Sequence, residues 1–453
     1  MVSGRVDRHL GEVSAPNLTV CDQSGEIRTT VLTPGVRVAT ELMPGLRSAS
    51  IGFWMTVGSR DESTSEAGAT HFLEHLVFRG TATRTGRMIS EEIDALGGEV
   101  NAFTAKEHTC FHARVMVDDV SRALALLADL VYAASLQDDA VDAEREVILK
   151  EVDLYQDSSD VRVHWLWAES FFAGHPLSHS SLGSLDDIRR LRADDLRRWY
   201  DTHYTLTNLV VTAAGGIDHD AFVEEIQIAL RSARPAGATR PARSAPKPVP
   251  RHPVEVHAQA SEQTHLVLGT LTVPRSSPDR YTVGVIAEAL GGGMGSRLYQ
   301  EVRERRSLAY VVYAHPAYET DHGTLEVYVS TTPDRAGEAV ELIAEEWTRL
   351  VRHGMQGGEL ERQKANLRRS VALSLENSAS RMNRLGKAVL SGAPLLGLEE
   401  NLAQIAAVTT DDAHSVLESM LTGPYALVAL GAAPSEDALH RAMRPLTARS
   451  SNP

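Results

Sequence analysis

The chain has 453 residues, 43% of them hydrophobic, and is long enough for two or three domains with substantial cores. Its 45 Lys and Arg against 60 Asp and Glu give a net charge of −15, which argues against a nucleic-acid partner. No apolar run is long enough to cross a membrane, and residues 1–16 carry charges without a signal-peptide core. Cys21 and Cys110 form no CxxC pair, so we expect free thiols in a soluble, cytoplasmic protein.

The first half of the chain mixes short strands and helices. β-branched residues alternate on both sides of Thr33-Pro34-Gly35, which predicts a hairpin over residues 26–39. Further strands are expected over residues 48–57, 99–117 (with a turn near 105–108) and 208–215, and helices over 68–79, 88–96, 121–134, 139–155 and 194–202. The order lacks strict βαβ alternation, so it predicts an α+β fold with a mainly antiparallel sheet rather than a doubly wound parallel sheet.

The second half repeats the first after a linker. Residues 231–250 are rich in Arg, Pro, Ala and Ser without periodicity, which is typical of a linker between domains at 1–230 and 251–453. At an offset of 217 residues, Ser50-Ile51-Gly52 matches Val267-Leu268-Gly269 and Leu209-Val210-Val211 matches Ala426-Leu427-Val428. Two copies of one domain are the economical explanation.

One helix carries the pattern H-x-x-E-H. If residues 68–79 are helical, with Gly80 as a left-handed residue that ends the helix, His71 and His75 leave the same face, about 40° apart. Glu74 falls between them, within reach of a water on any metal that the two histidines bind. This order of residues is the inverted form of the H-E-x-x-H motif of zinc peptidases. The alternative is a solvated helix face, because a short pattern can arise by chance among 18 histidines.

A second helix offers a third metal ligand. Glu144 and Glu151 lie two turns apart and project from nearly one face, so one could bind a metal while the other orients a histidine. The side expected to be buried carries Val147, Ile148 and Leu154. The alternative is two surface glutamates that pair with neighbouring basic residues.

These residues, in this order, resemble the zinc and catalytic residues of the M16 metallopeptidases, which are inverzincins. The resemblance covers nearly the whole chain, and its spacing matches the short-chain, processing-peptidase-like branch. Its other motifs are Gly97–Thr104, Trp199-Tyr200 with His203-Tyr204, and Gly291–Leu298 followed by Arg303 and Tyr310. The resemblance implies an M16/LuxS-like metallohydrolase fold with one Zn²⁺ per chain, held by His71, His75 and Glu151 and supported by Glu144.

The second copy is expected to lack a metal. The offset of 217 places the metal and base positions on Glu288, Gly291, Gly292 and Arg368, a set that cannot hold zinc. In the resembling family, an arginine and a tyrosine seven residues apart bind the peptide and stabilise the transition state, and they match Arg303 and Tyr310. The alternative for Arg303 is a solvated helix face. A P-loop is discounted because no Lys-Ser/Thr follows the glycines.

The resemblance also implies how a substrate is held. Asn101 and Ala102 would lie on an edge strand to which the extended peptide adds as a further strand, although a turn asparagine is the alternative for Asn101. Members that cleave presequences carry two acidic residues ten and fourteen positions after the distal zinc glutamate. Here these positions are Val161 and Trp165, which predicts a preference for a bulky or apolar side chain instead of arginine.

The function implied by the resemblance is that of a zinc-dependent endopeptidase. Glu74 would take a proton from zinc-activated water and deliver it to the leaving amine, while zinc and Tyr310 stabilise the oxyanion. Family members enclose the site in a chamber of four domains, so we expect a homodimer of this two-domain chain, with a heterodimer as the alternative, acting on peptides or unfolded polypeptides. The rival function is a non-catalytic peptide-binding or scaffold subunit, which typically loses the H-x-x-E-H residues that this chain keeps.

Overall fold

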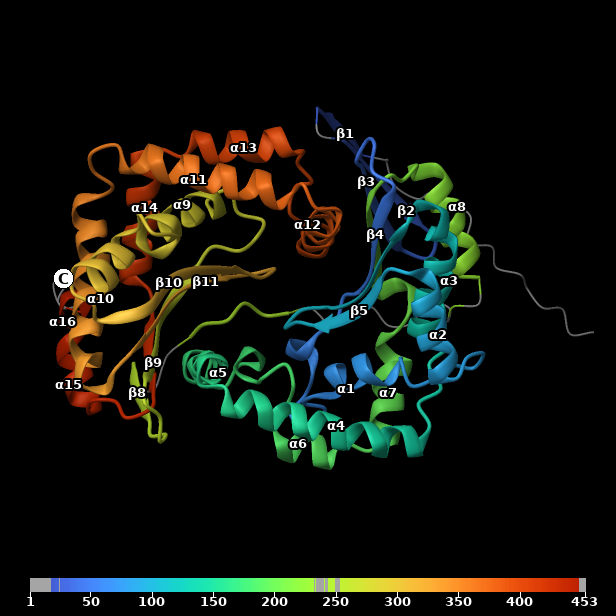
Figure 1. The fold of residues 1–453 in the computed structure, drawn as a ribbon, viewed down its shortest axis with the longest axis horizontal. Coiled ribbons are helices and arrows are strands. Elements are labelled where there is room, and N and C mark those ends of the chain that lie inside the picture. The colour runs from blue at the N-terminus through green and yellow to red at the C-terminus, as the bar shows by residue number, and fades with distance from the viewer. Residues whose placement is uncertain are drawn as a thin grey trace, which may run out of the picture. The chain divides into compact units, whose positions relative to one another are not determined.

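The computed structural model describes residues 18–23, 25–231, 233, 240, 243–248 and 253–447 (Figure 1). Residues 1–16 and most of the expected linker, 231–250, lie outside this part of the chain. The chain forms two compact units. Unit 1 comprises Met1–Lys150, Ser181–Arg243 and Ser374–Glu399, and unit 2 comprises Glu151–Ser180, Ser244–Leu373 and Glu400–Pro453.

Unit 1 is built on a seven-stranded sheet in the order β1-β2-β3-β7-β4-β6-β5. Its strands are β1 (Thr19–Asp22), β2 (Gly25–Leu32), β3 (Val36–Leu42), β4 (Ser48–Met55), β5 (Glu99–Thr104), β6 (Thr109–Met116) and β7 (Leu209–Gly215). All neighbouring strands are antiparallel except β3 and β7. The predicted hairpin is confirmed as β2–β3, and the strand predicted over 208–215 is confirmed as β7, which is buried throughout.

Helices surround this sheet. They are η1 (Ser59–Asp61), α1 (Ala69–Leu76), α2 (Gly86–Leu96), η2 (Val117–Asp119), α3 (Val120–Tyr132), α4 (Asp138–Asp157), α6 (Leu185–Arg190), α7 (Ala193–His203), η4 (Leu206–Asn208), α8 (His219–Ala229) and α12 (Ser378–Ser391). The boundary between the units falls within α4, which is one continuous helix.

The predicted end of α1 is wrong. The helix stops at Leu76 instead of residue 79, and Gly80 has φ 158°, which is not the left-handed conformation of a helix cap. Gly80 instead forms an antiparallel bridge with Thr85. The residue with a left-handed conformation is Gly68, at φ 88°, just before the helix begins.

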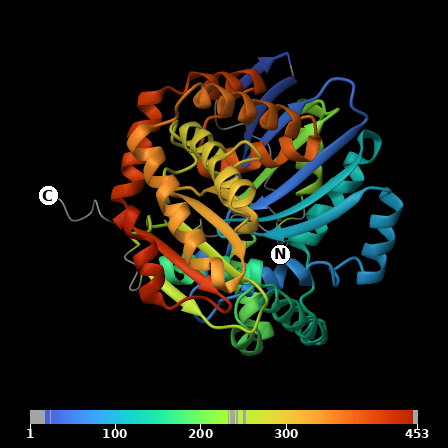
Figure 2. The same ribbon diagram turned by 60° about the vertical axis from the view of Figure 1, so that its left-hand side comes forward.

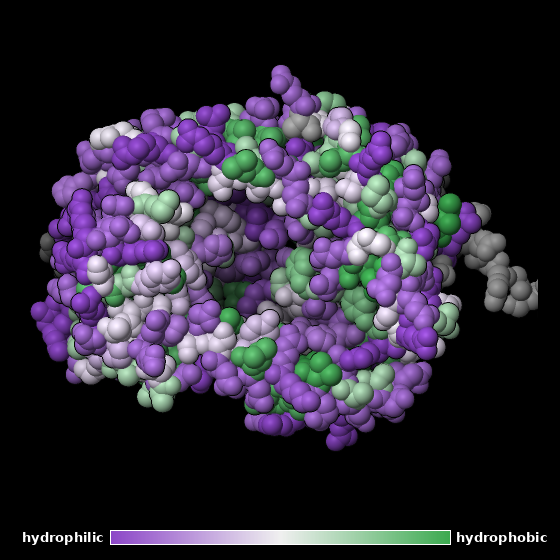
Figure 3. Space-filling view, viewed as in Figure 1, coloured by the Kyte–Doolittle hydropathy of each residue, from purple (hydrophilic) through white to green (hydrophobic). Residues whose placement is uncertain are grey.

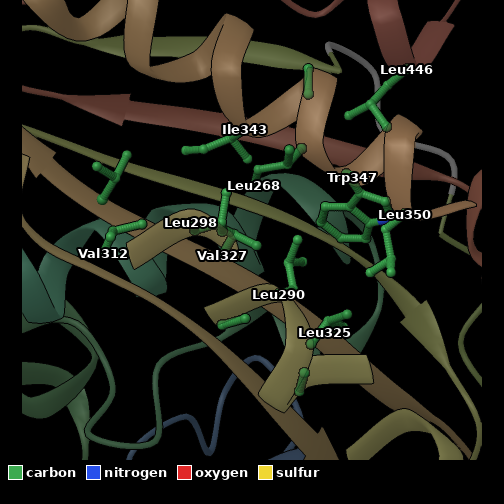
Figure 4. Close-up of a cluster of buried hydrophobic side chains, with 14 of the residues drawn as sticks. Leu268, Leu290, Leu298, Val312, Leu325, Val327, Ile343, Trp347, Leu350 and Leu446 are labelled. Carbon is green, nitrogen blue, oxygen red and sulfur yellow. The ribbon is translucent and has the colours of Figure 1, made fainter. Parts of the chain in front are cut away.

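Unit 2 contains a five-stranded sheet in the order β10-β11-β9-β12-β8. Its strands are β8 (Val254–His257), β9 (Thr264–Thr272), β10 (Ala309–Tyr318), β11 (Gly323–Thr331) and β12 (Tyr425–Leu430), and only β8 and β12 pair in parallel. Its helices are α5 (Ser159–Phe171), η3 (Pro176–Ser178), α9 (Arg280–Gly291), η5 (Tyr299–Arg305), η6 (Pro333–Arg335), α10 (Ala336–His353), α11 (Glu359–Ser374), α13 (Leu398–Ala407), α14 (Thr410–Thr422), α15 (Glu436–Ala442) and α16 (Arg444–Thr447). Leu290, Val327 and Trp347 belong to its apolar core (Figure 4).

The two sheets repeat one topology, which confirms the duplicated α+β fold. The order β3-β7-β4-β6-β5 in unit 1 corresponds to β8-β12-β9-β11-β10 in unit 2, with the parallel pair in the same place. The offset between copies is not constant, however. Ile51 pairs with Ala213, whereas Leu268 pairs with Leu427 and not with Leu430, as a fixed offset of 217 would require.

The sheet of unit 1 is covered by a helix from the second half of the sequence. Helix α12 lies against β3, β4 and β7 (Figures 1 and 2). Arg381 and Arg384 of this helix both pair with Glu41, a buried residue of β3. A Cβ added to Gly52 in β4 would lie 2.6 Å from Sδ of Met382, so glycine makes room for the helix.

The sheet of unit 2 is covered in turn by a helix from the first half. Helix α5 packs on β9 and β12, and the buried Trp167 donates its indole N–H to the carbonyl of Ala426 at 3.0 Å. A Cβ on Gly269 of β9 would lie 2.3 Å from the Trp167 ring. Each half of the sequence therefore supplies one helix to the other half's sheet.

The surface is mostly polar on the face shown in Figure 3, where hydrophobic side chains are scattered among hydrophilic ones. Within the described residues, no helix combines the length and apolar character that a bilayer crossing requires.

Candidate metal centre

Helix α1 is fixed at its first turn by Glu62. This buried carboxylate accepts hydrogen bonds from the backbone N–H of Gly68 at 2.9 Å and of Thr70 at 2.7 Å. The first N–H groups of a helix have no partner within the helix, so the two oxygens of a carboxyl group can satisfy them. Burial raises the pKa of Glu62 to about 8, although these hydrogen bonds act to lower it.

Gly68 is needed where the chain enters α1. Its φ of 88° lies in the left-handed region, and a Cβ there would meet Cδ1 of Ile188 at 2.7 Å. Phe72, Leu73 and Leu76 bury the opposite part of the helix in the core of unit 1. The histidines of α1 therefore project from a helix that is held both at its start and along its apolar face.

His71 and His75 lie one turn apart, and their rings converge. The two Nε2 atoms are 3.3 Å apart, and the ring planes meet at 68°. Two nitrogens that bind one tetrahedral zinc at about 2.0–2.1 Å each lie roughly 3.3–3.4 Å apart. The spacing of the two rings therefore fits a shared metal ion.

Glu151 completes a set of three ligands. One donor atom from each of His71, His75 and Glu151 lies within 4.8 Å of the other two, and no other such group occurs in the part of the chain that the structure describes. Glu151 lies on α4, one residue past the boundary between the units. Two imidazoles and one carboxylate, with a fourth position for water, are the donor set of a catalytic zinc site, so these residues fit Zn²⁺.

Glu144 fixes the orientation of His75. Its Oε1 accepts a hydrogen bond from Nδ1 of His75 at 2.9 Å, and its Oε2 accepts one from Nε of Arg79. Because Nδ1 donates, the proton is placed away from Nε2, whose lone pair faces His71. Burial acts to raise the pKa of Glu144, but the hydrogen bonds from His75 and Arg79 outweigh it, and the pKa falls below its usual value.

Glu74 lies on the same helix and is held by a residue that the sequence did not single out. The hydroxyl of Thr104 donates to Oε2 of Glu74 at 2.5 Å. Thr104 is the last residue of β5, so this bond joins α1 to the end of an edge strand. The one signal in the sequence was that Thr104 closes the family-like segment Gly97–Thr104.

The buried face of α4 differs from the prediction. Ile148 is fully buried as expected, but Val147 is 44% exposed and Leu154 is 69% exposed. The buried face instead includes Glu144, between the turns that carry Val141 and Ile148. The ion pair with Arg79 allows the Glu144 carboxylate to be buried at this position.

The residues expected to contact substrate lie on two elements. Asn101 and Ala102 are on β5 at the edge of the unit 1 sheet, where Asn101 is exposed and its Oδ1 accepts the N–H of Ala102 at 2.8 Å. Val161 and Trp165 are on α5 in unit 2, both partly buried, and the Trp165 ring lies 5.9 Å from that of Tyr155.

Arg303 and Tyr310 are brought together in unit 2. The Arg303 guanidinium lies over two rings, 4.8 Å from the centroid of Tyr299 and 4.6 Å from that of Tyr310. Cation–π contact of this kind holds the guanidinium over the two rings. Tyr310 itself is 76% exposed at the start of β10, an edge strand.

The fold and this group of residues define a family. The chain belongs to the M16 peptidases: the description "Insulinase (Peptidase family M16)" matches residues 37–184, and "Peptidase M16 inactive domain" matches residues 190–367. Curated relatives are similar in sequence to this chain over almost their whole length. An uncharacterized zinc protease of Streptomyces coelicolor is 39% identical over 418 residues, which are 90% of this chain and 90% of the relative.

Two further relatives carry similar names. An uncharacterized zinc protease of Mycobacterium leprae is 37% identical over 93% of this chain and 95% of its own length. The zinc protease YmxG of Bacillus subtilis, also uncharacterized, is 34% identical over 87% of this chain and 95% of its own length.

Solved structures share the fold. A protease from Helicobacter pylori superposes with a TM-score of 0.84 at 20% identity, over 90% of this chain and 99% of that one. A peptidase M16 inactive domain from Pseudomonas fluorescens gives 0.81 at 21% identity, over 90% and 98%.

Proposed function

We propose that the protein is a zinc-dependent endopeptidase that cleaves peptides or unfolded polypeptide segments. The observation that carries this proposal is the convergence of His71, His75 and Glu151, with Glu74 on the same helix as the two histidines. The names of the relatives, all zinc proteases, support a peptidase role.

A zinc ion held by His71, His75 and Glu151 would supply a Lewis acid that polarises water and the scissile carbonyl. Glu74 acts as the base that accepts the water's proton and then delivers it to the leaving amine. The hydrogen bond from Thr104 fixes the direction of the Glu74 carboxylate, so the base is oriented before substrate arrives.

Peptide binding is assigned to residues outside the metal group. We assign Arg303 and Tyr310 to binding of the peptide and stabilisation of the transition state, because the exposed Tyr310 is paired with a fixed cation. Asn101 and Ala102 present an edge strand to which an extended peptide can add.

Side-chain preference and assembly complete the proposal. Val161 and Trp165 favour a bulky or apolar substrate residue, since neither can compensate a buried guanidinium. We further propose that two copies of the chain form a closed chamber in the cytoplasm, where Cys21 and Cys110 stay unpaired.

The decisive experiment is incubation of the zinc-loaded protein with a diverse peptide mixture, with and without a chelator, read by mass spectrometry. We expect internal cleavages that the chelator abolishes and added zinc restores. The matched control is Glu74→Gln, which should retain zinc and lose cleavage. Peptides that bind but stay intact with the zinc-loaded wild type would overturn the proposal and favour a scaffold subunit.

A further inference from the structure

Arg243 lies within the linker and is the last residue of unit 1 before Ser244. The Arg243 side chain is only 9% exposed. Its Nε donates to Oδ1 of Asp61 at 2.9 Å, and its Nη2 donates to the carbonyls of Glu107 at 2.7 Å and Thr56 at 3.2 Å. A buried guanidinium is tolerated only when its donors are satisfied in this way, so Arg243 is built into unit 1.

One side of this contact leads to the start of α1. Asp61 closes the η1 turn by accepting the N–H of Gly58 at 3.0 Å as well as the Arg243 hydrogen bonds. The next residue is Glu62, whose carboxylate holds the backbone of Gly68 and Thr70. Arg243 thus binds the residue that precedes Glu62, and Glu62 fixes the start of the helix that carries both histidines and Glu74.

The other side leads to the end of β5. Glu107 lies in the turn between β5 and β6, and its carboxylate also pairs with the buried Arg60. The same turn accepts backbone hydrogen bonds from Ser59 and Arg60, at 3.2 Å and 2.8 Å. Three residues before Glu107 is Thr104, which holds the Glu74 carboxylate.

We infer that Arg243 is a positioning residue of the proposed zinc site. It touches neither the metal ligands nor β5 itself, but it clamps together the two loops that place Glu74 from opposite sides: the η1 turn before α1 and the turn after β5. Because Arg243 lies within the linker, this part of the linker is held against both turns. This inference rests on the proposed function, and it extends that function to a residue outside the site.

The test compares Arg243→Lys and Arg243→Ala with Lys247→Ala, which removes an exposed charge from the same linker segment. Lysine keeps the charge but cannot donate to Asp61 and two carbonyls in the planar fork of an arginine. Three quantities are measured for each variant: zinc affinity by chelator competition, kcat and KM per bound zinc, and the absorption spectrum of the Co²⁺-substituted protein. The melting temperature is recorded separately.

For Arg243→Lys we expect a folded protein whose kcat per bound zinc is lower by about 10-fold, with KM changed less, as for other residues that support a metal site. The Co²⁺ spectrum should shift, and Lys247→Ala should match the wild type in every quantity. If Arg243→Ala does not fold, Asp61→Asn replaces it, with the same expected shift.

A purely structural role predicts a lower melting temperature with unchanged kcat per zinc and an unchanged Co²⁺ spectrum in Arg243→Lys and Asp61→Asn. That result would overturn the inference. Failure of the proposed function is distinguishable, because it would appear as absence of zinc-dependent cleavage in the wild type. The Co²⁺ spectrum and the metal affinity would still report whether Arg243 shapes the site.

Discussion

Two glutamates on α4, Glu144 and Glu151, lie in different surroundings. Glu144 is 2% exposed and accepts hydrogen bonds from both His75 and Arg79, which keep it charged. Glu151, two turns further on, supplies the third donor atom beside the histidines. The seven-residue spacing in the sequence placed both on one face, but only the resemblance to a family distinguished ligand from support.

Replacing Glu144 tests this division at the level of one residue. Glu144→Gln removes the charge that fixes His75 and leaves Arg79 without its anionic partner, so zinc affinity should fall about 10- to 100-fold. The measurement is competition with a chelator of known affinity. Glu146→Gln, an exposed change on the same helix, should leave the affinity unaltered. Equal affinities for both variants would contradict the supporting role of Glu144.

Glu62 predicts a pH dependence of stability. Its pKa is raised from 4.5 to about 8 by burial, so the folded chain holds a proton that the unfolded chain releases between these values. The contribution of Glu62 to the free energy of unfolding should therefore be most favourable at low pH. It should fall as pH rises toward 8, by up to about 1.4 kcal/mol per pH unit. Denaturant unfolding of the wild type and Glu62→Gln between pH 5 and 8 measures the difference, and a flat difference would contradict it.

At the scale of one element, α1 shows which structural features a local sequence pattern can predict and which it cannot. Apolar spacing and the H-x-x-E-H motif correctly predicted a helix that carries both histidines. Its end was wrong because residues 77–79 form a turn that leads to the bridge of Gly80 with Thr85. Glu62 and Thr104 escaped prediction because each reaches α1 through a tertiary contact that no short period in the sequence encodes.

The start of α1 should be sensitive to a single added methyl group. Gly68→Ala places a Cβ at φ 88° and against Ile188, whereas Gly45→Ala has a similar φ of 85° with no atom within 4 Å. Left-handed backbone alone costs roughly 1–2 kcal/mol, so Gly45→Ala should lose about that amount. Gly68→Ala should lose more, and it should also weaken zinc binding. Thermal and denaturant unfolding of both variants measure the costs, and equal losses would refute the role of the Ile188 contact.

At the scale of the whole molecule, the two halves of the sequence are joined by more than a linker. Helix α5 belongs to unit 2 and α12 to unit 1, so neither half contains the complete cover for its own sheet. The duplication itself could be predicted from matched segments. The exchange of the two covering helices could not be predicted, because an amphipathic pattern shows that a helix face is buried without showing which sheet buries it.

The exchange predicts how separated halves behave. Residues 1–243 alone should expose the face of β4 that receives Met382, and residues 244–453 alone should expose the face of β9 that receives Trp167. We expect each fragment to be poorly folded alone and to recover its structure when both are co-expressed. Co-purification and circular dichroism measure this outcome. A lone 1–243 fragment that unfolds cooperatively would contradict it.

The crossed helices also bear on how the chain can change over generations. The second half of the sequence lacks the H-x-x-E-H pattern of the first, and a duplicate without the proposed metal site would ordinarily be free to be lost. Here the second half of the sequence supplies α12, which covers the sheet of the first half, and the first half supplies α5, which covers the sheet of the second. Deletion of either half would expose a sheet face of the other, so the two halves can differ in chemistry but must be retained together.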